Sequence, residues 1–366
     1  MDRKIRVAIT HGDINGISYE VILKALADES MLDLCTPVIY GSTRVASYWK
    51  KKLEIEGNLT WNQIRSTKEV RDGVINLLNI SDDDFKVTPG MISEDGGRAA
   101  LIALEKATSD VMMGYCDVLV TAPINKAAMP RDAFPYNGHT QYLEDKCAMV
   151  TGRSLMILCA YDVRVALVTT HIPVSDVPGA ITEELILEKL GVLDKTLRRD
   201  FGIGKPRIAV LSLNPHAGDS GLIGSEEISV IKPAIDKAFD SGIMTFGPYA
   251  ADGFWGSDVS IAFDGVLAMY HDQGLAPFKA LYMNSGVNIT AGLSIVRTSP
   301  DHGTGYDIVG KNEASEESMR HAIFAAIDIY RNRAEYDYIT RNPLRKIYYS
   351  GGKDDEKIDL TADSVD

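Results

Sequence analysis

Short runs of β-branched and other apolar residues alternate along this chain with longer stretches of helical periodicity, and this alternation restricts the possible fold more than any other feature. In residues 96–115 apolar residues recur at spacings of three and four, which predicts an amphipathic helix. Another helix is predicted over residues 183–200, with Thr182 as its N-cap. Alternating strands and helices are typical of a mainly parallel sheet covered by helices, so we expect an α/β fold. The predicted strands include residues 5–10, 117–121, 164–169, 207–213 and 265–269.

The composition argues against several classes of protein. With 366 residues, of which 45% are hydrophobic and 24% charged, the chain is long enough for two fused α/β lobes and lacks the bias of a disordered or fibrous sequence. A formal net charge of −13 argues against a nucleic-acid partner, which requires a basic surface. The four cysteines include no C-x-x-C pair, which argues against a disulfide framework. The first residues lack the apolar core of a secretory signal and no apolar run is long enough for a membrane span, so we expect a cytoplasmic protein without membrane contact.

Polar residues follow the predicted strands at the points where the strands end. Ligands of open α/β sheets bind at the carboxyl ends of the strands, so these residues are the first candidates for a site. Three of the seven histidines, His171, His216 and His271, stand at three separate strand ends. Neutral imidazoles are good ligands for zinc and its neighbours, and three of them leave a coordination position for a substrate. Loop histidines bonded to the backbone remain the alternative, because such wide spacing is not by itself a metal motif.

A second group of residues is suited to binding anions. Gly138, His139 and Thr140 open a predicted helix, whose first backbone N–H groups attract a phosphate or a carboxylate. An ordinary N-cap formed by Thr140 is the alternative. Further polar candidates fall on two apolar, strand-like stretches that come later in the chain, although each could equally be a solvated surface residue. They are Lys279, Asn288 and Arg297.

The fingerprint of a Rossmann dinucleotide site is missing, since no G-x-G-x-x-G follows any predicted strand. Residues 305–312 nearly form a P-loop but end in Asn312, which lacks the hydroxyl that would hold magnesium, so we reject a nucleoside triphosphatase. Residues 301–311 (DHGTGYDIVGK) instead resemble the adenosine-binding loop of isocitrate and isopropylmalate dehydrogenases, which bind NAD(P) without that fingerprint. This resemblance implies cofactor contacts at Gly303, Asp307 and Gly310.

Several short blocks recur along the chain in one order. They are TAPINK (residues 121–126), GHT (138–140), THIP (170–173), LNPHAG (213–218), YHDQGL (270–275) and VNIT (287–290). Together they resemble the signature of the 4-hydroxythreonine-4-phosphate dehydrogenase family of vitamin B6 biosynthesis, over about residues 6–330. The resemblance implies an isocitrate/isopropylmalate dehydrogenase-like fold with two α/β lobes and a cleft between them, and a homodimer with shared active sites. Residues 1–126 with 289–350 would form the lobe on the cofactor side, residues 127–288 the lobe on the metal and dimer side, and residues 351–366 a polar, acidic tail.

The implied reaction is the oxidation of the secondary alcohol of 4-phosphohydroxy-L-threonine by NAD or NADP, after which the β-keto acid loses CO2 to leave 3-amino-2-oxopropyl phosphate. The resemblance also implies a divalent metal, with Zn²⁺ the first choice and Co²⁺, Ni²⁺ or Mg²⁺ as alternatives, which would stabilise the alkoxide from which hydride leaves. Carried over residue by residue, the metal ligands are His171, His216 and His271. The substrate-binding positions are His139, Thr140, Lys279, Asn288 and Arg297. Asp252 and Asp272 correspond to acidic positions near the family's site, and no residue is identified as the catalytic base.

The chain departs from the family in the first block, which usually reads GDPAGIGPE. Residues 12–20 read GDINGISYE here, so both prolines are replaced and the loop is less preset before folding. The substrate could therefore differ, and a paralogue with the same chemistry would oxidise another phosphorylated hydroxy acid or a cyclic diol. A non-catalytic metal- or phosphosugar-binding protein on the same fold is the third hypothesis, distinguished by ligand binding without NAD turnover.

Overall fold

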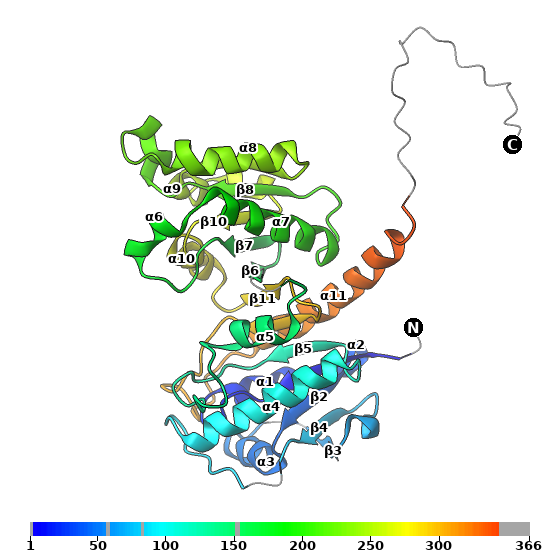
Figure 1. The fold of residues 1–366 in the computed structure, drawn as a ribbon. Coiled ribbons are helices and arrows are strands. Elements are labelled where there is room, and N and C mark those ends of the chain that lie inside the picture. Colours follow the sequence, from blue (N-terminus) through cyan, green and yellow to red (C-terminus); the bar gives the residue numbers. More distant parts are fainter. Residues whose placement is uncertain (1–2, 56–58, 82–83, 151–153, 344–366) are drawn as a thin grey trace, which may run out of the picture.

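The computed structural model describes residues 3–55, 59–81, 84–150 and 154–343, so the predicted acidic tail lies outside the described residues. Within these ranges the chain forms one sheet of twelve strands with helices packed against it (Figure 1). The α/β fold with a mainly parallel sheet is therefore confirmed. In their order across the sheet, the strands are β3 (Trp61–Ile64), β4 (Ile75–Asn79), β2 (Cys35–Gly41), β1 (Ile5–Thr10), β5 (Val118–Thr121), β12 (Arg297–Pro300), β11 (Val287–Ala291), β6 (Leu155–Ala160), β7 (Val163–Leu167), β10 (Gly265–Ala268), β8 (Arg207–Leu211) and β9 (Met244–Tyr249).

Two blocks of parallel strands make up most of this sheet. From β3 to β12 every neighbouring pair is parallel, and so is every pair from β7 to β9. Between the two blocks, β11 and β6 run antiparallel to their neighbours and join the blocks into one continuous sheet. The lobe boundaries near residues 126 and 289 stay a prediction.

The helices pack against this sheet. The α-helices are α1 (Ser18–Leu26), α2 (Met31–Leu34), α3 (Thr43–Lys52), α4 (Glu94–Met112), α5 (His139–Cys147), α6 (Val177–Ala180), α7 (Glu183–Arg199), α8 (Lys232–Asp240), α9 (Ala251–Trp255), α10 (His271–Tyr282) and α11 (Glu317–Ile339). Shorter helical turns are η1 (Thr67–Glu69), η2 (Val174–Asp176), η3 (Pro215–Gly221), η4 (Glu227–Ile231) and η5 (Asp258–Ala262). The long α11 contacts β12, β5 and β1 of the first parallel block and the linking strand β11, as well as the helices α1 and α7.

Local sequence explains where several helices begin. Thr182 caps α7 as predicted, with its hydroxyl accepting a hydrogen bond from the Leu185 N–H at 3.2 Å. One prediction is wrong: Lys279 lies on α10 and not on a strand-like stretch. Gly274 and Pro277 are poor helix formers, but Leu275 and Phe278 are buried on one face of α10, which packs on β7 and β10, and this burial outweighs the local propensity.

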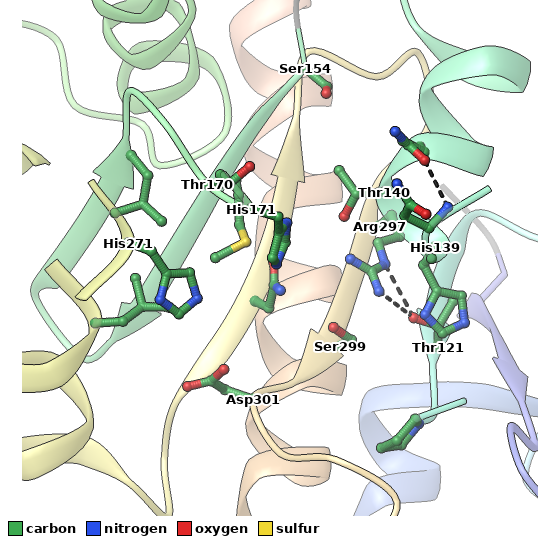
Figure 2. A pocket seen from close by; sticks show the side chains of 18 of the residues that line it. Thr121, His139, Thr140, Ser154, Thr170, His171, His271, Arg297, Ser299 and Asp301 are labelled. Carbon is green, nitrogen blue, oxygen red and sulfur yellow. Dashed lines mark hydrogen bonds between the residues drawn. The ribbon is translucent and has the colours of Figure 1, made fainter. Parts of the chain in front are cut away.

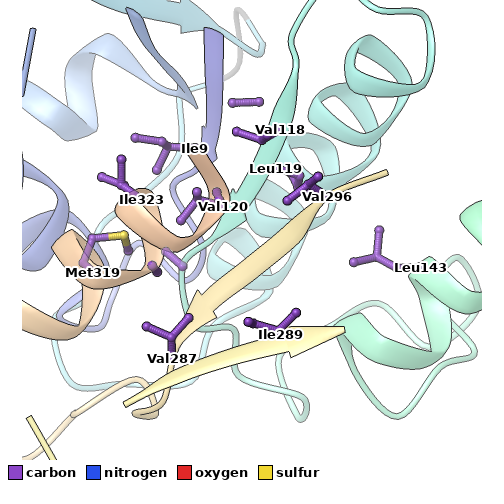
Figure 3. Close-up of a cluster of buried hydrophobic side chains, with 14 of the residues drawn as sticks. Ile9, Val118, Leu119, Val120, Leu143, Val287, Ile289, Val296, Met319 and Ile323 are labelled. Atoms are coloured by element: carbon purple, nitrogen blue, oxygen red, sulfur yellow. The ribbon is translucent and has the colours of Figure 1, made fainter. Parts of the chain in front are cut away.

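The hydrophobic core lies along the sheet and fixes the strand ends that carry the site. Figure 3 shows Ile9 of β1, Val120 of β5 and Ile323 of α11, which belong to one cluster of buried side chains. All three are fully buried, as expected for strands covered by helices. Across the described ranges, no helix has both the length and the apolar character needed to cross a membrane.

Candidate active site

A pocket of about 640 Å³ lies where the residues after β5, β7 and β12 meet the first turns of α5 and α10 (Figure 2). Its walls contain most of the residues predicted from the sequence. All five predicted substrate-binding residues line it, as do two of the three histidines and one glycine of the cofactor loop. They are His139, Thr140, Lys279, Asn288, Arg297, His171, His271 and Gly303.

Five predicted site residues lie outside the walls of this pocket. Asp252 is exposed at the start of α9, where its carboxylate accepts a hydrogen bond from the Gly253 N–H at 2.8 Å. Asp272 stands one residue beyond a wall residue, Asp307 is exposed, and Gly310 packs against Lys52. The fifth is His216, whose place is described below.

The ring centroids of His171 and His271 are 5.8 Å apart, and in Figure 2 His171 lies between His271 and Arg297. His271 Nδ1 is 2.7 Å from the Asp272 carboxylate, and this contact orients the ring while Nε2 takes no part in it. Burial, followed by the charges of Lys126 and His271, lowers the pKa of His171, which favours its neutral, metal-binding form. These two imidazoles fit a divalent metal of the zinc type.

His216 lies on η3, outside the pocket formed by its own chain. Backbone φ is positive at every residue from His216 to Ser220, and His216 itself is exposed. The Glu227 carboxylate fixes the entry to this turn, because it accepts hydrogen bonds from the Leu213 and Asn214 N–H groups at 2.8 and 2.7 Å. In the part of the chain that the structure describes, no three His, Cys, Asp or Glu residues come together as metal ligands. The three-histidine site therefore stays a prediction.

Arg297 lies on the side of the pocket opposite to His271 (Figure 2). Its side chain is 3% exposed, and its guanidinium donates to the Thr121 hydroxyl at 2.7 and 3.1 Å and to the Thr290 hydroxyl at 2.9 Å. Burial lowers the pKa of Arg297 to about 10, so the group is still charged at neutral pH. No carboxylate pairs with it among the described residues. A buried cation without a counter-ion is costly, and an anionic ligand in the pocket would supply the missing charge.

His139 and Asn288, which line the same pocket, also have buried polar atoms that are unpaired among the described residues. Burial, with the charges of Arg297 and Lys126, holds the pKa of His139 well below its usual value, so its imidazole is neutral. His139 Nε2 and Asn288 Oδ1 are buried and lack a hydrogen-bond partner within the described ranges. Unsatisfied buried polar atoms in a pocket wall are groups that a bound ligand can satisfy.

Four further charged residues, Lys126, Glu144, Lys189 and Asp301, line the pocket but were not selected as site residues from the sequence. Lys126 follows β5, and its ammonium group makes neither an ion pair nor a hydrogen bond within the described parts of the chain. Its position in the loop that follows β5 was a usable signal. Asp301 lies 3.2 Å from Lys279, and burial raises the pKa of its carboxyl group against the opposing effect of that lysine.

A mainly parallel α/β sheet whose pocket combines histidines, lysines and a buried arginine is typical of one class of protein: α/β enzymes that act on small anionic substrates. A sequence model of the family described as pyridoxal phosphate biosynthetic protein PdxA matches residues 33–326. The chain is 53% identical to a 4-hydroxythreonine-4-phosphate dehydrogenase of Bacteroides thetaiotaomicron, over 100% of this chain and 99% of the relative. The chain belongs to the PdxA family, as its sequence blocks predicted.

Solved structures agree with this family assignment. A 4-hydroxythreonine-4-phosphate dehydrogenase from Klebsiella pneumoniae aligns with a TM-score of 0.76 and 33% sequence identity, covering 89% of this chain and 99% of that one. A terephthalate 1,2-cis-dihydrodiol dehydrogenase from Burkholderia xenovorans LB400 aligns with a TM-score of 0.58 and 23% identity, covering 89% of this chain and 98% of that one. The second similarity reflects a shared fold alone.

Proposed function

We propose that this chain oxidises 4-phosphohydroxy-L-threonine with NAD or NADP and that the product decarboxylates to 3-amino-2-oxopropyl phosphate, in the biosynthesis of pyridoxal phosphate. One observation supports the proposal in addition to family membership: Arg297 is a buried cation that faces the pocket next to His139 and has no counter-ion among the described residues. Arginine binds phosphate or carboxylate through two parallel hydrogen bonds. The substrate carries one group of each kind, which suits a pocket with several cations.

The residues around Arg297 would hold and orient the substrate. Thr140 offers a hydroxyl beside the start of α5, where unpaired backbone N–H groups favour an anion. Lys279, paired with Asp301, and Lys126, which has no partner among the described residues, add positive charge to the same walls. Asn288 Oδ1 can accept from a hydroxyl or an ammonium group of the substrate. Substrate held at several points is positioned for hydride transfer.

His171 and His271 would hold a divalent metal, and Zn²⁺ is the first choice because imidazole nitrogen suits it, with Co²⁺, Ni²⁺ or Mg²⁺ as alternatives. When bound, such an ion supplies Lewis-acid stabilisation of the substrate alkoxide and of the carbonyl formed from it. The role of Asp272 would be to orient the His271 ring through the hydrogen bond to Nδ1. Gly303, Asp307 and Gly310 would contact the cofactor.

A homodimer with shared active sites would complete the ligand set. His216 lies outside the pocket of its own chain, on an exposed turn that a second copy could receive. Leu222, Ile223 and Ile228 beside this turn are 82%, 41% and 59% exposed, and exposed apolar groups of this kind favour a protein interface. In this proposal residues 127–288 form the metal and dimer side, and residues 1–126 with 289–350 form the cofactor side.

We also propose a cytoplasmic location. All four cysteines, Cys35, Cys116, Cys147 and Cys159, are buried as free thiols. Free thiols are typical of the reducing compartments of the cell.

The experiment that tests this function follows absorbance at the NADH band with purified protein, NAD and 4-phosphohydroxy-L-threonine, before and after chelation and after re-addition of Zn²⁺. NADH formation that is lost on chelation and restored by metal is the expected result. Silence with this substrate but turnover of another phosphorylated hydroxy acid or a cyclic diol would instead identify a paralogue. Silence with every alcohol, despite bound metal, would indicate a binding protein.

A further inference from the structure

The segment of residues 13–20, in which this chain departs from the family's proline-containing block, is buried and held by hydrogen bonds. The Asn15 side chain donates to the Met91 carbonyl and to the Ser93 hydroxyl, at 3.0 and 2.7 Å, and accepts from the Thr88 N–H at 2.7 Å. The Ser18 hydroxyl donates to the Pro123 carbonyl at 3.2 Å, and the Tyr19 hydroxyl accepts from the Ser42 N–H at 3.0 Å. These bonds fix a loop that the replaced prolines no longer restrict.

Hydrogen bonds and close packing connect this segment to the start of the glycine-rich segment, residues 303–314. The Ile17 N–H donates to the Thr304 carbonyl at 2.9 Å. Gly16 approaches the same carbonyl so closely that a Cβ atom would stand 2.5 Å from its oxygen. The Tyr306 hydroxyl donates to the Asp13 carboxylate, which also accepts from the Asn15 N–H at 2.9 Å. Asp13 is 1% exposed, so its hydrogen bond to Tyr306 is shielded from water.

A second set of hydrogen bonds connects residues 20 and 24 to the other end of the glycine-rich segment. The Glu20 carboxylate accepts from the Ala314 N–H at 2.9 Å and from the Lys24 ammonium at 2.8 Å. Lys24 also donates to the carbonyls of Asn312 and Ala314, at 3.1 and 2.8 Å. Residues 13–24 therefore hold both ends of the glycine-rich segment, whose residue Gly303 lines the pocket.

We infer that residues 13–24 act as a two-point clamp that fixes the glycine-rich segment in the shape that binds the cofactor, with Asp13 and Tyr306 as positioning residues. The inference rests on the proposed assignment of residues 303–310 to the cofactor. A glycine-rich loop that is already ordered loses less conformational entropy when it binds a ligand. Removing a hydrogen bond from either set should therefore weaken cofactor binding more than it alters substrate binding or the chemical step.

The first test is Tyr306→Phe in the metal-loaded protein. The change removes one hydrogen bond to a buried carboxylate, so we expect the KM for NAD to rise about tenfold while kcat and the substrate KM stay within about twofold. Tyr330→Phe is the matched control, because Tyr330 likewise donates to a carboxylate, that of Asp117, at 3.2 Å but at the start of β5, away from the pocket. An unchanged KM for NAD in Tyr306→Phe, or an equal rise in both KM values, would overturn the inference.

The second test asks whether Asp13 and Tyr306 act through each other. Asp13→Ala should weaken NAD binding about as much as Tyr306→Phe, and the double variant should be no weaker than either single one. Asp13→Asn keeps an oxygen that accepts from Tyr306 and should restore most of the affinity. Fully additive losses would show that the two residues do not act as a pair.

NAD titrated calorimetrically into the protein without substrate separates the clamp from the proposed function. Binding by the unaltered protein, about tenfold weaker in Tyr306→Phe, supports the clamp whatever the alcohol substrate proves to be. Equal affinities overturn the clamp and leave the proposed function intact. No NAD binding by the unaltered protein would overturn both.

Discussion

At the scale of single residues, the site is distinguished by a buried positive charge, that of Arg297, which has no counter-ion in the described part of the chain. Two buried arginines make the contrast. Arg333 donates two hydrogen bonds to the Asp200 carboxylate, at 2.7 and 2.8 Å, whereas Arg297 has only threonine hydroxyls as partners among the described residues. A buried ion pair is part of the folded structure itself, whereas a buried cation that lacks an anion and faces a pocket is available to bind an anionic ligand.

This contrast gives a paired prediction. Arg297→Met should raise the substrate KM by about 100-fold or more, because two charge-assisted hydrogen bonds are lost, while the free energy of unfolding changes by no more than about 1 kcal/mol. Arg333→Met should leave KM unchanged but lower the free energy of unfolding by about 3–5 kcal/mol, because Asp200 is left as a buried, unpaired charge. Steady-state kinetics and urea unfolding of both variants check this. A normal substrate KM in Arg297→Met would place Arg297 outside the binding site.

His11 gives a prediction about pH. Its ring is fully buried between the Tyr19 hydroxyl and the Ala99 carbonyl, and burial lowers its pKa to about 4. The folded pKa lies below the ordinary value of 6.5, so protonation favours the unfolded chain: the stability is present above pH 6.5 and is lost as the pH falls towards 4. Between pH 7 and pH 5 this residue should remove about 2 kcal/mol from the free energy of unfolding.

His11→Gln isolates this effect, because glutamine keeps a donor and an acceptor but does not titrate. Urea unfolding at the two pH values should show a loss that is smaller in the variant by about 2 kcal/mol. Equal losses in both proteins would mean that His11 carries no such linkage.

Much of the site could be predicted at this scale because its residues match the family's positions one by one, several of them within short blocks in a fixed order. Three of the five substrate-binding candidates, His139, Thr140 and Asn288, lie in those blocks. Lys279 and Arg297 were carried over from the same family resemblance, and all five residues line the pocket. Lys126 was not selected, although it lies in the TAPINK block after β5, because a lone lysine is usually a solvated surface residue, and its side chain is exposed here as well. Its significance depends on the absence of a partner among the described residues, and that is a property of the folded chain.

At the scale of elements, prediction succeeded where local signals were sufficient. Thr182 and the acidic first turn of α7 favour a helix start at this point whatever the tertiary surroundings. We therefore expect Thr182→Ala to lower the free energy of unfolding by about 1 kcal/mol, since the Leu185 N–H loses its partner, with no change in kcat or KM. Urea unfolding measures the first effect, and unaltered stability would show that the cap contributes nothing.

Prediction failed where tertiary packing determined the secondary structure, or where the direction of a strand in the sheet had to be known. Lys279 was placed on an apolar, strand-like stretch, yet burial of one face holds α10 together in spite of Gly274 and Pro277. The antiparallel link through β6 was also missed. β6 and β7 are joined by Tyr161 and Asp162, and this pair carries no glycine to mark a hairpin, although Tyr161 adopts a positive φ of 51°.

At the scale of the whole molecule, the position of His216 bears on assembly. His171 and His271 meet in the pocket of one chain, whereas His216 is presented elsewhere. If sites are shared between two copies, each site takes His216 from one chain and His271 from the other. His216→Ala and His271→Ala should then each be inactive and bind less metal while remaining folded.

Mixing these two inactive variants, with subunit exchange, tests the arrangement. A mixed dimer would contain one site that has both intact histidines, so random reassociation should restore about a quarter of the original activity. Turnover that stays at zero, in a mixture shown to exchange subunits, would mean that both histidines of a site come from the same chain.

The central claim is that this pocket oxidises and decarboxylates a phosphorylated hydroxy-amino acid with the help of NAD and a metal. The most direct measurement quantifies NADH and CO2 together in one reaction of the metal-loaded protein with 4-phosphohydroxy-L-threonine and NAD. The account predicts that both products appear in equal amounts and that chelation abolishes both. Absence of NADH from fully metal-loaded, folded protein at saturating substrate and NAD would contradict it.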